Sequence, residues 1–138
     1  MPLSRNNRRL AVAAAVLVPV AAAGAVTADY MDESRDLTMR AALVTGGDPA
    51  AGQAKFIGYG CGSCHSLKNV RHAVGMVGPR LDGVALRAMI AGKLANNPGN
   101  LQHWIRDPQA VSPGTAMPDL DVGERDARDI AAFLYTRS

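Results

Sequence analysis

The sequence predicts an all-α domain behind an apolar N-terminal segment. Two pairs typical of helix starts, Asp48-Pro49 and Asn97-Pro98, each place a capping side chain before a proline at the first helical position. The segments around them have helical periodicity and little enrichment in β-branched residues, so we expect no strand of consequence. At 138 residues the chain is long enough for one domain and an appendage.

The N-terminal segment, residues 1–28, has the pattern of a secretory signal peptide or of a single membrane anchor. Residues 10–28 carry no charge and follow three arginines, and 19 apolar residues are just enough to span a bilayer. The run is mostly alanine and ends in Val26-Thr27-Ala28, which suits cleavage before Asp29. Both options stay open, and both place the domain in the periplasm or at the outer face of the inner membrane.

Residues 29–47 are polar and charged, so we expect a linker with a short helix around residues 37–43. The domain proper is expected to run from residue 48 to residue 138. Its first helix begins behind the Asp48 cap and ends near Tyr59, where glycines interrupt it.

Three further elements are expected in the middle of the domain. A loop over residues 66–78 leads to a short helical stretch over residues 86–94. The helix behind Asn97-Pro98 is expected to continue through Arg106 and to stop at Pro108, since proline disfavours the helical conformation before it.

The last part of the chain contains a turn and a final helix. Residues 112–115 form a turn that delivers Met117 in an extended segment. Asp121 with Glu124 resembles a capping box at the start of the final helix. The apolar face of that helix carries Ile130, Phe133 and Leu134.

Both cysteines of the chain lie in the motif Cys61-Gly62-Ser63-Cys64-His65. C-x-x-C-H is typical of the covalent attachment of a c-type haem. Two thiols three residues apart on one helical turn reach the two vinyl groups at one porphyrin edge, and the next residue, His65, is carried under the iron. The aromatic content of 4% is too low for a large self-sufficient core, and a buried haem would supply the missing apolar mass.

Three other readings of the motif fit the sequence less well. A structural zinc site needs two more ligands at short spacing, but His72 and His103 lie 31 positions apart. A redox dithiol of the thioredoxin kind needs a βαβ context, which the helical periodicity does not provide. A plain disulfide explains neither His65 nor the residues after it.

The charge of the chain bears on its partners. The formal charge of +3 comes from the three arginines at the N-terminus, and without them basic and acidic residues balance. Nucleic-acid binding therefore has no electrostatic support. Residues 50–106 contain seven basic residues and one acidic residue, Asp82, so a haem edge among them would give a mildly positive docking face.

From about Asp48 to its end the chain resembles a monohaem class I cytochrome c. Gly52 and Phe56 match the small and aromatic pair that this family packs against its last helix, where Ile130 and Phe133 stand at the matching places. The resemblance implies an all-α, cytochrome c-like fold of three to five short helices around one covalently attached haem.

Two further stretches carry the resemblance. Gly78-Pro79-Arg80-Leu81 resembles the segment whose proline carbonyl accepts a hydrogen bond from the ligating histidine. Residues 101–108, followed by residues 113–117, resemble the helix and loop that carry the sixth ligand. The resemblance thus implies one haem c bound through Cys61 and Cys64, with His65 and Met117 as the iron ligands.

The sequence departs from the mitochondrial type at two positions. Trp104 stands where an aromatic hydroxyl often lies near the methionine sulfur, and Ala116 replaces a lysine just before the methionine. The lysine-rich docking ring of that type is therefore thinned here.

Met117 is also favoured as the sixth ligand by its surroundings. Adjacent prolines restrict its backbone, and the 52 residues after His65 let the chain cross to the opposite haem face. Met76 and Met89 are expected to fill the core or a loop, and both remaining histidines are expected to be structural. The apolar wall is expected to contain Phe56, Leu81, Trp104 and Ile105, and Arg80 or Trp104 is expected to hydrogen-bond a haem propionate.

Histidine and methionine ligation indicates a function. With both axial positions filled, the iron changes oxidation state with little rearrangement, which suits electron transfer rather than catalysis. We expect a single-electron carrier, or an electron-transfer subunit, of a membrane respiratory chain whose partners are a terminal oxidase or a quinol-oxidising complex. The alternative is a haem enzyme or gas sensor, peroxidase-like, with a displaceable sixth ligand.

Overall fold

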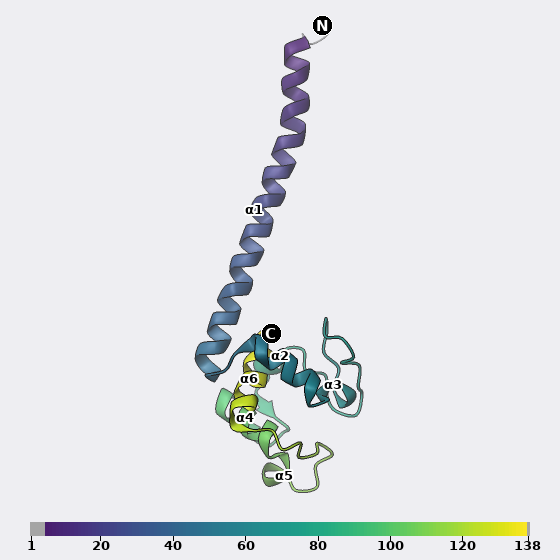
Figure 1. Ribbon diagram of the computed structural model, residues 1–138, viewed down its shortest axis with the longest axis vertical. Coiled ribbons are helices and arrows are strands. Elements are labelled where there is room, and N and C mark those ends of the chain that lie inside the picture. Colours follow the sequence, from purple (N-terminus) through teal and green to yellow (C-terminus); the bar gives the residue numbers. More distant parts are fainter. Residues whose placement is uncertain (1–4, 138) are drawn as a thin grey trace. The chain divides into compact units, whose positions relative to one another are not determined.

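The computed structural model describes residues 5–137 (Figure 1). Helices make up 61% of the chain and strands 5%, which confirms the all-α prediction. Contacts divide the chain into two compact units, one ending at Asp36 and the other beginning at Leu37. The elements are α1 (Arg5–Thr45), α2 (Pro49–Gly58), α3 (Cys61–Cys64), the 3-10 helix η1 (Val84–Leu86), β1 (Met89–Ile90), β2 (Leu94–Ala95), α4 (Pro98–Arg106), α5 (Pro108–Val111) and α6 (Glu124–Tyr135).

The first unit is the N-terminal part of α1. The span Asn6–Thr45 is long and apolar enough to cross a membrane, with a mean hydropathy of 2.2 in its most apolar window and no part of that window buried. A signal sequence near the N-terminus has the same properties. The helix is therefore compatible with both expected roles, a cleaved leader and a retained anchor.

The segment expected as a linker is helical as far as Thr45, rather than only around residues 37–43. No glycine or proline interrupts residues 29–45, so nothing in the sequence breaks the helix there. Gly46, with a φ of +70°, follows the end of the helix, and its N–H donates to the Ala42 carbonyl at 2.9 Å.

The last turns of α1 belong to the second unit. Ala41 and Thr45 are buried, and the Gln102 side-chain amide on α4 donates to the Thr45 carbonyl at 2.8 Å. The compact unit therefore includes residues before the Asp48 cap. That cap is formed as expected, since the Asp48 carboxylate accepts from the Ala50 N–H at 2.8 Å.

Helices α2 and α6 form the main packing contact of the second unit. The Phe56 and Phe133 rings lie 5.7 Å apart between centroids, and both side chains are buried together with Ile130. Gly52 allows the close approach, because a Cβ at this position would lie 1.8 Å from the Asp129 carbonyl oxygen and 2.8 Å from the Phe133 Cβ. The expected packing of Gly52 and Phe56 against the last helix is confirmed.

Replacing Gly52 with alanine is expected to destabilise the protein by about 3 kcal/mol, since the new methyl group must push two helix backbones apart. Gly58 on the same helix is the matched control, because a Cβ there would meet nothing within 4 Å. Denaturant unfolding of both variants measures the difference. A Gly52→Ala protein as stable as Gly58→Ala would contradict the packing described here.

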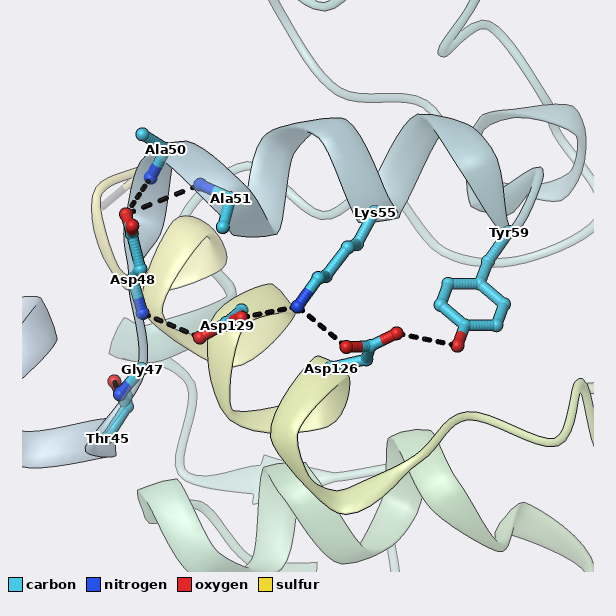
Figure 2. Close-up of polar contacts among 9 residues, drawn as sticks. All are labelled: Thr45, Gly47, Asp48, Ala50, Ala51, Lys55, Tyr59, Asp126 and Asp129. Carbon is cyan, nitrogen blue, oxygen red and sulfur yellow. Dashed lines mark hydrogen bonds and ion pairs between the residues drawn. The ribbon is translucent and has the colours of Figure 1, made fainter.

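A partly buried polar network, shown in Figure 2, joins the same two helices. The Lys55 ammonium contacts Asp126 at 2.6 Å and Asp129 at 2.5 Å, and Asp129 also accepts the Asp48 N–H at 2.7 Å. The Tyr59 hydroxyl donates to Asp126 at 2.8 Å. Hydrogen bonding to Lys55 lowers the pKa of Asp126, so this network stabilises the fold at neutral pH and loses strength in acid.

The helical prediction over residues 86–94 is wrong. Antiparallel strands β1 and β2 occupy this region, with Met89 opposite Ala95 and Ile90 opposite Leu94. The turn between them places Ala91 and Gly92 at φ values of +50° and +67°, which a helix does not accept.

Two further predictions about helix ends need correction. Asp121 does not cap α6: it has a φ of +54°, and the N-cap is Gly123, which has no side chain to accept a hydrogen bond. Pro108 does stop α4, but it also begins α5, whose N-cap Asp107 accepts the Ala110 N–H at 2.9 Å.

Candidate functional site

A cavity of about 450 Å³ lies inside the second unit. Its volume falls in the range of small-molecule and cofactor sites. Most of its lining is apolar, and it comes from helices α2, α3, α4 and α6, from the β1 hairpin and from the loop before α6. The core of this unit, in a chain with few aromatic residues, therefore contains a cavity.

Helix α3 brings both cysteines to the cavity. Gly60, with a φ of +71°, precedes it, and the His65 N–H closes the turn on the Cys61 carbonyl at 2.9 Å. The two thiols lie on the single turn expected from their spacing. Burial raises the pKa of the Cys61 thiol to about 11, so this group is a neutral thiol at pH 7 in the polypeptide alone.

The His65 ring lines the same wall and is held by the segment after it. Its Nδ1 lies 2.7 Å from the Pro79 carbonyl oxygen, an atom that can only accept. Nδ1 therefore carries a proton, and in the neutral ring Nε2 keeps a lone pair for a metal. Gly78 makes room for the ring, since a Cβ at this position would lie 2.3 Å from His65 Cε1.

Met117 lines the cavity from the loop between α5 and α6 and is half-buried. Met89, on β1, also lines the cavity, so two methionines reach it rather than one. Met76 is 92% exposed and does not fill the core. His72 and His103 are both exposed, and neither lines the cavity.

The remaining wall is apolar. Phe56, Leu81, Trp104 and Ile105, the residues predicted to form an apolar wall, all line the cavity. Three exposed apolar side chains continue it to the surface: Val77 is 73% exposed, Met89 46% and Leu120 37%. The rim of the cavity is thus more apolar than basic.

The basic residues near the cavity are arranged differently from the expectation. The Arg80 guanidinium pairs with Asp82 at 3.0 Å and is mostly exposed, and Arg80 does not line the cavity. Arg87 does line it, and its guanidinium donates to the carbonyls of Arg80 and Asp82. The sequence analysis did not predict Arg87 as a cavity residue, because it placed this residue in a helix. The position of a basic residue among apolar neighbours could have indicated it.

These residues fit a covalently held haem. Two thiols, a histidine with a free Nε2 and a thioether all line the cavity, and most of the rest of its lining is apolar. In a c-type haem, two cysteine thiols attach to the porphyrin, and imidazole and thioether ligate the iron. In the part of the chain that the structure describes, no group of three His, Cys, Asp or Glu residues forms an alternative metal site.

Comparison with known proteins agrees with this chemistry. The family model described as Cytochrome c matches residues 49–138. A cytochrome c oxidase subunit 2 of Alkalihalophilus pseudofirmus is 37% identical over 84 residues, which cover 60% of this chain and 24% of that protein. A cytochrome c oxidase subunit 2 of Bacillus sp. strain PS3 is 37% identical over 73 residues, covering 51% of this chain and 20% of the relative. No solved structure matches. The chain thus spans about a quarter or less of each relative.

Proposed function

The chain belongs to the cytochrome c family, and on this premise we propose that it passes single electrons to a terminal oxidase of a membrane respiratory chain. The observation that carries the proposal is that His65 and Met117, which lie 52 residues apart in the sequence, line one apolar cavity. The two relatives named above are oxidase subunits, which supports an oxidase as the partner. A quinol-oxidising complex is the corresponding donor.

Cys61 and Cys64 would hold haem c covalently, and its iron would supply one-electron chemistry. His65 is the proposed fifth ligand, and the Pro79 carbonyl fixes its tautomer and raises the basicity of its Nε2. Met117 is the proposed sixth ligand, a soft thioether that favours the reduced state. With both positions filled, the site transfers electrons and does not act as an enzyme.

The other side chains control the environment of the iron. The apolar wall excludes water and disfavours the extra charge of the oxidised state, which raises the potential. For the haem propionates we propose Trp104 and Arg87, since both line the cavity. Arg80 serves this role only if it leaves Asp82, so we place it second.

The apolar N-terminal helix keeps the domain at the exported side of the membrane, either by directing its export or by anchoring it. Retention as an anchor raises the local concentration of the domain near a membrane-bound oxidase. Electrostatic steering is then not required, and the apolar rim formed by Val77, Met89 and Leu120 is sufficient for docking.

The test is the oxidation of the reduced, haem-loaded protein by the terminal oxidase of its own membrane, followed optically. We expect fast oxidation whose rate changes less than about threefold between low and high salt, because charge contributes little to the contact. Introducing a charge on the rim with Val77→Lys is expected to slow the reaction about tenfold.

Ile57→Lys is the matched control, since Ile57 is 48% exposed and does not line the cavity. Failure of the oxidase to oxidise the protein, together with rapid turnover of peroxide, would favour the alternative function, a peroxidase-like haem enzyme or a gas sensor.

A further inference from the structure

The loop that carries Met117 is bound by one side chain, the amide of Gln109 on α5. Gln109 Nε2 donates to the Thr115 carbonyl at 3.0 Å and to the Met117 carbonyl at 2.9 Å. Its Oε1 accepts the Gly114 N–H at 3.1 Å. A single side chain therefore holds the backbone at three positions between the α5 end and the methionine.

The chemistry of these contacts requires a primary amide. The side chain must give two N–H bonds and accept one, and among the twenty side chains only asparagine and glutamine do both with one planar group. A glutamate in the same place would accept the Gly114 N–H but could not donate to either carbonyl. The three bonds together thus depend on the identity of residue 109.

Gln109 itself is held firmly. Pro108, the first residue of α5, is fully buried, and the Asp107 carboxylate accepts the Ala110 N–H at 2.9 Å at the start of the same turn. The Ser112 N–H donates to the Pro108 carbonyl at 2.9 Å. The backbone that carries the Gln109 side chain is thereby fixed to the domain.

The loop beyond it has mainly local contacts. The Thr115 N–H donates to the Ser112 carbonyl at 3.0 Å, and the Met117 N–H approaches the Thr115 hydroxyl at 3.5 Å, a long distance for a hydrogen bond. Gly114, with a φ of +79°, is exposed, and a Cβ added to it would meet nothing within 4 Å. These features describe a segment that opens easily without a bond to the rest of the domain.

We propose that Gln109 is a positioning residue that holds the Met117 thioether at the cavity and so keeps the sixth position of the iron closed. The inference rests on the proposed function, since it takes Met117 as the ligand. Loss of two or three hydrogen bonds increases the population of the open loop, and an open loop leaves the position to any competing ligand.

The experiment is a titration of the oxidised, full-length, haem-loaded protein with imidazole, followed by the loss of the absorbance band of the iron–thioether bond. In Gln109→Ala, the imidazole concentration for half displacement is expected to fall at least about tenfold. Gln109→Glu is expected to show the same fall, because it keeps the size and acceptor of the side chain and loses both donors. It also serves as the second variant if Gln109→Ala does not fold.

Gln102→Ala is the matched control. Its amide also donates to a backbone carbonyl, that of Thr45, at 2.8 Å, but it does not touch the Met117 loop. This variant is expected to need the same imidazole concentration as the unchanged protein.

Hydrogen exchange gives a readout that does not depend on the iron. The Gly114 amide is expected to exchange faster in Gln109→Ala and to stay protected in Gln109→Glu, whose carboxylate still accepts its N–H. If both Gln109 variants match Gln102→Ala in imidazole binding, the positioning role is overturned and the proposed function stands. If the unchanged protein has no iron–thioether band, both are overturned.

Discussion

Replacing Cys61 and Cys64 together with alanine is expected to leave no haem on the polypeptide after denaturation. The thioether bonds are the one covalent attachment that the cavity residues offer, because both thiols lie on the single turn of α3 at its wall. The proposed coordination by His65 and Met117 does not survive unfolding. A denaturing gel stained for haem measures the result, and the expected loss of stain is complete.

Ser63→Ala is the matched control, since Ser63 stands between the two cysteines and its variant keeps both thiols. It is expected to stain as strongly as the unchanged protein. The double cysteine variant is also expected to lose much of its stability, because the centre of its core then depends on a haem held without covalent bonds. Haem stain that persists in the double variant would contradict the attachment.

Replacing Met117 with alanine is expected to keep the haem attached and to open the iron. Loss of the thioether removes the ligand that favours the reduced state, so the reduction potential is expected to fall by on the order of 0.1 V. The vacant position is expected to let carbon monoxide bind readily to the reduced form. A redox titration and a carbon monoxide difference spectrum measure the two effects.

Met89→Ala is the control that this prediction needs, because Met89 also lines the cavity. It sits on β1, whose pairing with β2 keeps its backbone in place, and we expect its removal to leave ligation unchanged. If Met89→Ala lowers the potential and Met117→Ala does not, the sixth ligand has been assigned to the wrong loop.

Much of the fold was predictable from local signals. Asp48-Pro49 and Asn97-Pro98 mark helix starts because capping depends on adjacent residues, and α2 and α4 begin where these pairs indicate. The packing of α2 against α6 was predicted from the resemblance of Gly52 and Phe56 to a family pair, and the close approach at Gly52 explains why a small residue stands there. The placement of both thiols on one turn followed from their spacing alone.

The errors arose where tertiary contacts or turn geometry override local preference. The 86–94 segment has a helical pattern, but left-handed residues at its centre turn it into a hairpin. Aspartate is a residue type that often caps helices, but the backbone of Asp121, with a φ of +54°, does not have the conformation of a helix N-cap. Arg87 replaced Arg80 as the first arginine proposed for the propionates. Arg80 pairs with Asp82, while Arg87 is held by the backbone carbonyls of Arg80 and Asp82, and neither set of contacts could be predicted from the sequence.

The polar contacts between α2 and α6 could not be predicted from the sequence. Lys55 pairs with Asp126 and Asp129, and no periodic pattern in the sequence indicates that these residues are neighbours. The three bonds of Gln109 lie close in sequence, but they depend on a loop shape that composition does not specify. Such contacts become visible once the backbone is placed.

The visible absorbance spectrum of the oxidised protein at neutral pH tests the central claim most directly. A haem attached through Cys61 and Cys64 and ligated by His65 and Met117 predicts a coloured protein with a weak band near the red edge of the visible, the signature of iron bonded to thioether sulfur. A colourless protein, or a haem spectrum without that band, would contradict the account.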